Sequence, residues 1–322
     1  MLSLTAEKIK NMEIRGAGRI ARAAVRALGE YSSTLPAGTL PEFREKMEEA
    51  ASLLLSTRPT AVSLPNAVHA VMSVLRRDFS TLEEAREEFS RRCEAFIAAS
   101  EQAVRRIGEI GAHHIRDGDV LLTHCNSEAA LACMVEARKR GRDFSVFATE
   151  VRPRNQGLLT IRTLDDAGIP TNYIVDSAAR TFMNEVDLVI VGADAISVNG
   201  AVVNKIGTSL IALAAHESRT RVMVAAETYK FAPRTILGEY IAIEERDPAE
   251  VLSPELAGSF SHVRVRNPAF DVTPAEYVDL IVTEAGAIPP QMAYIIIRDL
   301  LGWDIGDFTH GYPGNAGGGR EK

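Results

Sequence analysis

The chain has 322 residues, of which 46% are hydrophobic and 25% charged, and a formal net charge of −7. This composition is typical of a globular protein with one large or two ordinary domains. The negative charge disfavours general nucleic-acid binding, which needs a basic face. No apolar run is long enough to predict a transmembrane helix. Cys93, Cys125 and Cys133 form no CxxC pair, which indicates reduced thiols and a cytoplasmic location.

A helical pattern extends from about residue 5 to 112 and predicts a helical N-terminal domain over residues 1–115. Two arginines stand at breaks in this pattern: Arg15 precedes Gly16-Ala17-Gly18, and Arg58 precedes a proline. Glycines allow backbone amides to approach an anion closely. Each motif also has a simpler explanation. The Gly-Ala-Gly motif could be a plain helix break, and Arg58 could be a surface residue.

From residue 117 onward the pattern changes to alternating strands and helices, which predicts a parallel sheet with right-handed crossovers. The expected strands lie at residues 120–123, 144–148, 171–175, 188–191, 222–226, 241–244 and 280–283, and the expected helices at 128–140, 158–167, 206–215 and 290–301. The predicted fold class is α/β, with the helical domain followed by a Rossmann-like catalytic domain over residues 116–322. The glycine-rich end, from Gly311, is expected to be a flexible tail.

Polar residues follow the expected strands, where open α/β sheets bind their ligands. Asp194 follows the strand at 188–191, and Asn204-Lys205 precedes the expected helix at 206–215. A helix N-terminus together with a lysine favours an anion. This stretch therefore predicts half of a site for a phosphorylated small molecule, while a capping role for Asp194 and a solvated Lys205 remain the alternative.

Cys125 follows the first expected strand, beside His124 and just before a helix N-terminus. Such an environment lowers the pKa of a thiol, so a proton-transfer pair with Asp194 is plausible. An inert buried cysteine is the alternative, which fits Cys133 on the next helix better. The adjacent pair His113-His114 lacks metal-ligand spacing, so no metal site is expected.

Six motifs, in order, resemble one superfamily, that of the aldose-1-phosphate isomerases and the regulatory subunits of the translation-initiation exchange factor. They are RGAGRIARAA, TRPTAVSLPNAV, LLTHCNSEAAL, TEVRPRNQG, VGADAISVNGAVVNKIGTSLIALAA and AETYKF, and the resemblance covers about residues 9–297. The forms RGAGRI and CNSEAA favour the branch of archaeal ribose 1,5-bisphosphate isomerases over the methylthioribose-1-phosphate isomerases.

The resemblance implies a catalytic pair, Cys125 and Asp194, that converts ribose 1,5-bisphosphate to ribulose 1,5-bisphosphate by acid–base proton transfer through a cis-phosphoenolate. It implies no cofactor and no metal. The substrate-binding residues that it implies are Arg15, Gly16, Ala17, Gly18, Arg58, Ser127, Arg152, Gln156, Asn204 and Lys205. The contacts of Arg154, Gln156 and Lys230 are less closely defined, and direct hydride transfer is the competing route.

Two other functions stay open at this point: an isomerase for methylthioribose 1-phosphate or another aldose 1-phosphate, and a non-catalytic regulatory or nucleotide-sensing subunit. The resemblance further implies AMP as an activator, a role in AMP and nucleoside breakdown that feeds Rubisco, and a homohexamer built as a trimer of dimers. The apolar stretch at residues 267–301 gives independent support to a homo-oligomer.

Overall fold

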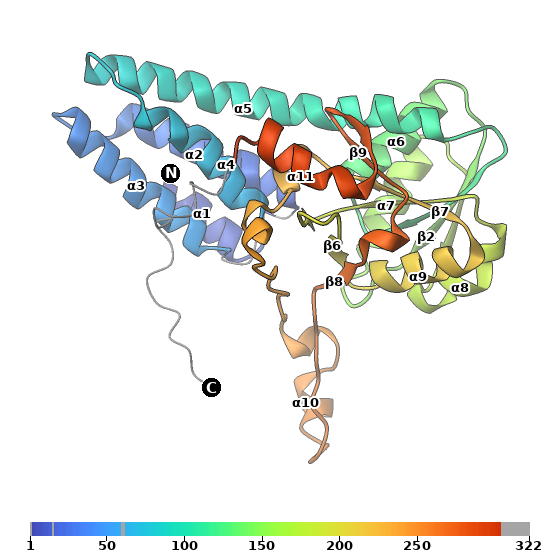
Figure 1. Ribbon diagram of the computed structural model, residues 1–322. Helices are drawn as coiled ribbons and strands as arrows, with labels where there is room; N and C mark the ends of the chain where they lie inside the picture. Colours follow the sequence, from blue (N-terminus) through green and yellow to red (C-terminus); the bar gives the residue numbers. More distant parts are fainter. Residues whose placement is uncertain (1, 15, 59–61, 304–322) are drawn as a thin grey trace. The chain divides into compact units, whose positions relative to one another are not determined.

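The computed structural model describes residues 2–14, 16–58 and 62–303 (Figure 1). Arg15 and the glycine-rich tail therefore lie outside the described residues. The chain forms two compact units, Met1–Gln102 with Leu301–Lys322, and Ala103–Leu300. They divide within the long helix α5, Leu82–Gly111, whereas the sequence placed the change near residue 115. That boundary stays a prediction about independently folding domains.

The first unit is helical. Its elements are α1 (Leu2–Lys10), α2 (Ala17–Thr34), α3 (Leu40–Ser56), α4 (Ser63–Met72), η1 (Ser73–Arg76) and the first part of α5. Each helix buries one apolar face, with Ile9, Leu28 and Phe43 fully enclosed. Thr81 caps the start of α5, because Glu84 N donates to Thr81 Oγ1 at 3.1 Å, while the Glu84 carboxylate accepts from Ser80 N at 2.8 Å.

The second unit is built on a seven-stranded sheet of order β10-β9-β7-β4-β1-β2-β3. The strands are β1 (Val120–His124), β2 (Ser145–Thr149), β3 (Thr171–Ile174), β4 (Leu188–Gly192), β7 (Arg221–Ala225), β9 (Leu280–Thr283) and β10 (Gly286–Ile288). All neighbours pair in parallel except β10 with β9. The predicted α/β class with a Rossmann-like parallel sheet is therefore confirmed.

A second, three-stranded antiparallel sheet was not predicted. It joins β5 (Ala195–Ile196), β6 (Val202–Lys205) and β8 (Phe270–Thr273). Asn204 and Lys205 therefore lie in a strand, and the next helix, α9, begins later, at Thr208. This sheet could not be predicted from the sequence, because β8, one of the two partners of β6, lies more than sixty residues away along the chain. The strand expected at residues 241–244 is wrong, since only an isolated bridge, Glu245 to Pro268, forms nearby.

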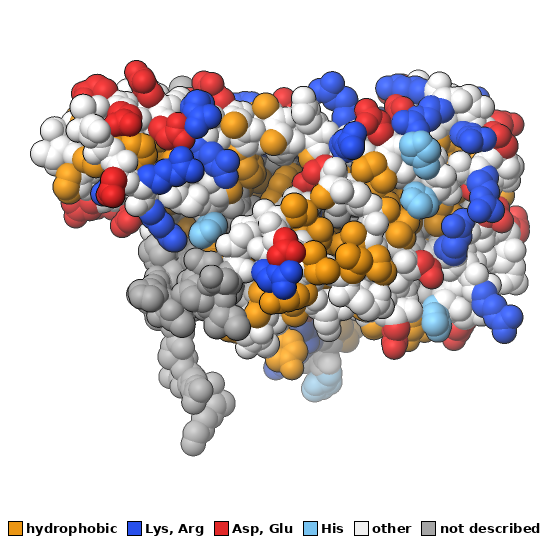
Figure 2. Space-filling view, turned by 45° about the horizontal axis from the view of Figure 1, so that its top comes forward, with side chains coloured by type: hydrophobic (Ala, Val, Ile, Leu, Met, Phe, Trp, Pro, Cys, Tyr) orange, Lys and Arg blue, Asp and Glu red, His pale blue; other side chains and the backbone are white. Residues whose placement is uncertain are grey.

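The expected C-terminal helix is broken into three short pieces, η9 (Pro290–Met292), α11 (Ala293–Ile295) and a π-helical turn, η10 (Ile296–Leu300). Figure 2 shows apolar side chains gathered on this face of the molecule. The exposed ones from these pieces are Met292, Tyr294, Ile295 and Leu300, whereas Ile296 and Ile297 are buried within the chain.

The other short elements are η2 (Ala112–His114), η3 (Asp176–Ala178), η4 (Met183–Glu185), η5 (Thr228–Lys230), η6 (Pro233–Leu237), η7 (Pro248–Glu250), α10 (Pro254–Ala257) and η8 (Ala275–Tyr277). The segment that carries α10 extends away from the sheet (Figure 1). Among the described residues, the structure has no helix with the length and apolar character needed to cross a membrane.

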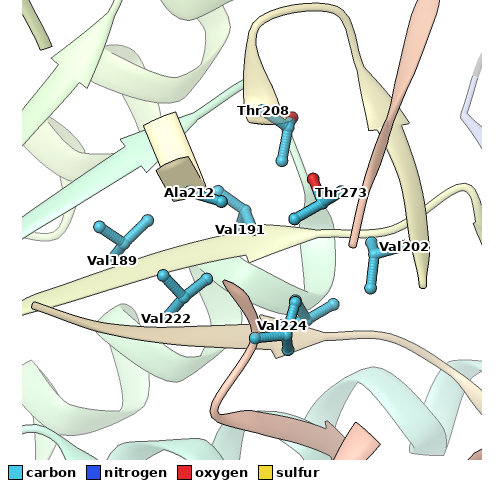
Figure 3. Close-up of a pocket in the computed structure, with 9 residues that line it drawn as sticks. Val189, Val191, Val202, Thr208, Ala212, Val222, Val224 and Thr273 are labelled. Atoms are coloured by element: carbon cyan, nitrogen blue, oxygen red, sulfur yellow. The ribbon is translucent and has the colours of Figure 1, made fainter. Parts of the chain in front are cut away.

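Helices cover both faces of the main sheet. On one face lie α6 (Glu128–Lys139) and α7 (Gly157–Asp166), and on the other α8 (Ala179–Phe182) and α9 (Thr208–Ser218) (Figure 1). The sequence of strand β4 is apolar throughout because both of its faces are buried. Leu188 and Ile190 join the core with α6, while Val189 and Val191 line a small apolar pocket beside α9 (Figure 3). Both faces are buried, as in other parallel sheets.

Candidate active site

The site lies where the strand order of the main sheet reverses. From β1 the chain passes to β2 and β3 on one side and to β4, β7 and β9 on the other. Ligands of open α/β sheets bind at the carboxyl ends of the strands at such a switch point. Because His124 of β1 is in register with Val191 of β4, Cys125 and Asp194 follow neighbouring strands. The structure therefore brings the two predicted catalytic residues to the same edge of the sheet, close enough for the Asp194 carboxylate to affect the pKa of the thiol.

Cys125 is held in an unusual backbone conformation, with φ 71°. Positive φ is rare outside glycine, and it persists only where neighbouring contacts enforce it. Here Thr160 Oγ1 donates a hydrogen bond to the Cys125 carbonyl at 2.9 Å, and Cys125 Sγ donates to Gln156 Oε1 at 3.5 Å. Ser127 caps helix α6 by accepting from Ala130 N at 3.3 Å. The loop thus fixes the direction of the thiol.

The expected lowering of the Cys125 pKa is wrong for this structure. Burial raises the pKa of the thiol to about 11, and the Asp194 carboxylate adds to the rise. Lys205 opposes this effect, but it does not outweigh the loss of water around the sulfur. The thiol is therefore neutral near pH 7, and forming a thiolate requires a change in its surroundings.

His124 serves as a structural tie. Its ring is buried, with Nε2 2.8 Å from the Ile206 carbonyl and Nδ1 2.6 Å from Thr149 Oγ1. A carbonyl only accepts, so Nε2 carries the proton and Nδ1 accepts from the hydroxyl. Burial lowers the pKa of His124, which favours this neutral form. The imidazole therefore joins the loop after β1 to the residue that follows Lys205.

Lys205 is 7% exposed and packs against the ring of Phe270, with Nζ 4.8 Å from the ring centroid. Burial lowers the pKa of this ammonium, while Cys125 and Asp194 raise it. Among the described residues, no carboxylate lies within ion-pair distance of it. Its neighbour Asn204 donates from Nδ2 to Thr208 Oγ1 at 3.0 Å. Lys205 thus places a poorly solvated positive charge near Cys125 and Asp194.

A pocket opens at the ends of β2 and β6. It is lined by Val151, Arg152, Pro153, Arg154, Gln156, Lys205, Ile206, Arg246, Glu250, Asn267, Pro268 and Ala269. Three predicted binding residues, Arg152, Gln156 and Lys205, therefore meet around one space. The backbone N of Arg152 donates to Asp176 Oδ2 at 2.8 Å, and its side chain is exposed. Arg154, by contrast, forms an ion pair with Glu250.

Lys230 lies near Asp194 in a buried cluster. Its Nζ is 2.7 Å from Glu227 Oε2, and Tyr229 donates from its hydroxyl to Glu227 Oε1 at 3.0 Å. Although burial favours the neutral amine, Glu227 raises the pKa of Lys230, and Asp194 adds to the rise. Lys230 is therefore protonated near pH 7, with Glu227 as its direct partner.

The N-terminal binding candidates that the structure describes belong to the first unit. Gly16, with φ 87°, occupies the N-cap of α2, so Ala17 and Gly18 begin that helix. Ser63 Oγ donates to the Ala17 carbonyl at 3.3 Å, and Arg58 Nη1 lies 3.0 Å from Met12 Sδ. Within this unit, these contacts join Ala17 to the start of α4 and Arg58 to the segment that follows α1. Their part in the site stays a prediction.

Sequence reasoning missed Arg246, Glu250 and Asn267. They lie in a region whose sequence was interpreted as a sheet strand and a connection, and no motif marks them. The one signal near Arg246 is the run of charged residues at 244–247, and only a known partner segment shows which of these side chains faces a site. Among the described residues, no group of three or more histidine, cysteine or acidic side chains could hold a metal ion.

Comparison with known proteins gives a consistent result. The model of the "Initiation factor 2 subunit family" matches residues 13–290. The ribose 1,5-bisphosphate isomerase of Methanocaldococcus jannaschii is 55% identical over 93% of this chain and 95% of its own length. That of Archaeoglobus fulgidus is 54% identical over 92% and 93%.

More distant relatives act as a contrast. The methylthioribose-1-phosphate isomerase of Acetivibrio thermocellus is 39% identical over 88% of this chain and 87% of its own length. Among solved structures, the Pyrococcus horikoshii translation initiation factor eIF-2B superposes with a TM-score of 0.75. It is 34% identical and covers 90% of this chain and 97% of its own.

Proposed function

Because the chain belongs to the initiation factor 2 subunit family and matches ribose 1,5-bisphosphate isomerases at 54 and 55% identity, we propose that it converts ribose 1,5-bisphosphate to ribulose 1,5-bisphosphate. One observation carries the proposal: Cys125 and Lys205 lie together at the switch point of the sheet, where each lowers or raises the pKa of the other and the Asp194 carboxylate raises the pKa of both. A regulatory subunit has no need of a thiol, a carboxylate and a desolvated ammonium gathered in this way.

The reaction moves a proton from C2 to C1 and opens a ring whose C1 carries a phosphate. Asp194 protonates the ring oxygen, and Cys125 removes the C2 proton, so that a cis-phosphoenolate forms. Return of that proton from Cys125 to C1, together with transfer of the C2-hydroxyl proton to Asp194, gives the C2 ketone and restores both groups, with no net change in atoms or electrons. Since burial raises the pKa of Cys125 to about 11, the thiolate depends on Lys205, which lies close enough to stabilise it.

Two groups of cations are proposed to hold the two phosphates and the hydroxyls between them. The second unit supplies Arg152 and Lys205, with Asn204, Gln156 and Ser127 near the sugar. The family resemblance adds Arg15, Gly16, Ala17, Gly18 and Arg58 as proposed substrate ligands, because backbone amides beside glycine suit a phosphate oxygen. Arginine binds phosphate in a bidentate manner, and such charge-assisted contacts are the strong ones.

We further propose a cytoplasmic homohexamer built from dimers, activated by AMP and placed in AMP breakdown, where its product feeds a Rubisco. Exposed apolar side chains around α11, among them Tyr294 and Ile295, support an interface there (Figure 2). Ile296 and Ile297 are buried within the chain. Fewer apolar side chains are therefore free for an interface than the sequence indicated.

Turnover of ribose 1,5-bisphosphate against methylthioribose 1-phosphate tests the function. We expect the bisphosphate to be the better substrate by at least about tenfold in kcat/KM, because charge-assisted phosphate contacts are strong. When the assay is run in D₂O, proton transfer places deuterium at C1, whereas hydride transfer does not. Preference for the thiomethyl sugar would reassign the substrate, and an absence of turnover with either sugar would reject the enzyme.

A further inference from the structure

A short antiparallel ladder borders the pocket. Arg246 N donates to the Asn267 carbonyl at 2.9 Å, and Ala269 N donates to the Glu244 carbonyl at 2.8 Å. Side chains alternate along extended backbone. Glu245 therefore points to the opposite side from its two neighbours, where Arg266 Nε donates to Glu245 Oε1 at 2.9 Å. Arg246 therefore lies on the opposite side of the ladder from Glu245, where it lines the pocket.

Hydrogen bonds tie this ladder to the catalytic loop. Ile206 N donates to the Ala269 carbonyl at 3.1 Å, and His124 Nε2 donates to the Ile206 carbonyl at 2.8 Å. Cys125 follows the histidine, and Lys205 precedes the isoleucine. The ladder is therefore fixed with respect to the thiol and the ammonium, so the arginine on it has a defined place in the site.

Arg246 has unused hydrogen-bonding capacity. Its side chain is 13% exposed, and the nearest carboxylate oxygen, Glu244 Oε1, is 3.5 Å from Nε. Arg246 Nε is buried and has no hydrogen-bond partner among the described residues. Neighbouring arginines differ, because Arg154 and Arg266 each donate a hydrogen bond to their carboxylate partner, whereas the ion pair of Arg246 with Glu244 includes no hydrogen bond from Nε. A buried donor without an acceptor is costly, so a site that keeps one is suited to an acceptor that arrives from outside.

Two cations with incomplete bonding thus share one wall of the pocket. Burial lowers the pKa of Lys205, and the positive charge of Arg246 lowers it further. Arg152, exposed at the rim, adds a third positive charge. Such a group is stabilised by an anion with at least two negative charges and several acceptor oxygens, which is the chemistry of a phosphate monoester.

We propose that Arg246 binds a phosphate group of the substrate, together with Lys205 and Arg152. The proposal rests on the function proposed above, which it deepens by naming the side chain that selects a phosphorylated ligand in the second unit. A bound phosphate would complete the bonds of Nε and relieve the repulsion between the two buried cations.

The test compares Arg246→Gln with Arg266→Gln, a matched loss of an arginine from the same ladder on its solvent side. Binding of ribulose 1,5-bisphosphate to the full chain is measured by calorimetry, which needs no turnover. We expect Arg246→Gln to weaken binding about 10- to 100-fold, the range of a charge-assisted contact, and Arg266→Gln to remain within about twofold of the unaltered protein.

Thermal unfolding of the ligand-free variants separates binding from folding. Arg246→Gln removes a buried donor that lacks a partner, so its melting temperature should match or exceed that of the unaltered protein. If it unfolds, Arg246→Lys, which keeps the charge and loses the planar fork, takes its place, and we expect about tenfold weaker binding.

Outcomes for the inference and for the function are distinct. Equal binding by Arg246→Gln and the unaltered protein overturns the inference even if the enzyme turns over ribose 1,5-bisphosphate. Weaker binding by this variant, with no turnover by the unaltered protein, supports the inference and rejects the function. If the unaltered protein fails to bind the bisphosphate, both are rejected.

Discussion

The two edges of the main sheet use polar groups in opposite ways. At the amino edge, carboxylates complete the hydrogen bonds of the strand ends. Asp187 Oδ2 accepts from Val120 N at 2.9 Å, and Asp279 Oδ2 accepts from Val222 N at 2.7 Å. In each pair the acid and its donor belong to different strands, so these bonds fix the register of the sheet.

At the carboxyl edge the bonding is incomplete. The thiol of Cys125 is desolvated, and Lys205 and Arg246 lack hydrogen-bonded carboxylates among the described residues. Strained backbone gathers there as well, with positive φ at Cys125 and at Val151. Charged and buried groups occur at both edges, so neither property distinguishes them. Lys205 and Arg246 at the carboxyl edge keep hydrogen-bonding capacity that a ligand can use.

The largest expected effect is the loss of catalysis at the carboxyl edge. Cys125→Ser and Asp194→Asn should each lower kcat by about 100- to 10,000-fold, because each removes a group that transfers a proton. The matched control is Cys133→Ala, since Cys133 is buried on α6 and its thiol donates only to backbone, to the Ala129 carbonyl at 3.2 Å. Steady-state kinetics and circular dichroism of all three variants provide the measurement. Activity within a few-fold of the unaltered protein in either site variant would reject its catalytic role.

The amino edge should show the reverse pattern. Asp279→Ala leaves Val222 N without its acceptor at 2.7 Å, so we expect a loss of about 1–3 kcal/mol in the free energy of unfolding and an unchanged kcat at temperatures where the variant is folded. Asp279→Asn keeps an acceptor oxygen and is the control, with a smaller loss. Urea unfolding followed by kinetics tests both. A fall in kcat without a fall in stability would mean that the two edges are not separate in function.

How much of this could be predicted from the sequence depends on the distance of each interaction along the chain. Cys125 and Asp194 could be placed at one edge of the sheet, because a strand and its following residues are adjacent in sequence. Lys205 was expected just before a helix and not in a strand, because its strand pairs with β8, more than sixty residues away. Arg246 was missed for the same reason, since only its pairing with Asn267 turns it toward the pocket.

The pKa of Cys125 could not be predicted, because it depends on water excluded by several elements at once. A histidine neighbour and a nearby helix start indicated a lower value. Desolvation by the folded chain instead raises the pKa to about 11. His124 gives the thiol no positive charge, because burial lowers the pKa of the imidazole and its two hydrogen bonds fit the neutral ring.

The smallest expected effect tests whether an incompletely bonded polar group destabilises the fold at a position where no ligand is expected. Thr273 of β8 is buried, and its Oγ1 has no hydrogen-bond partner among the described residues. Figure 3 shows this side chain in an apolar pocket lined mostly by valines. Incomplete bonding here serves no substrate, so removal of the hydroxyl should stabilise the fold. Thr273→Val keeps the shape of the side chain and should raise the free energy of unfolding by about 1 kcal/mol.

The matched control is Thr123→Val in the main sheet, where the hydroxyl donates to the Ile190 carbonyl at 2.8 Å. Both threonines are buried strand residues, so the two substitutions differ mainly in whether a hydrogen bond is lost. We expect Thr123→Val to destabilise the protein by about 1 kcal/mol, opposite in sign to Thr273→Val. Urea midpoints measured with equal m-values decide the matter. If both variants lose stability equally, an unpaired hydroxyl carries no cost in this fold, and the physical basis for distinguishing the two edges of the sheet fails.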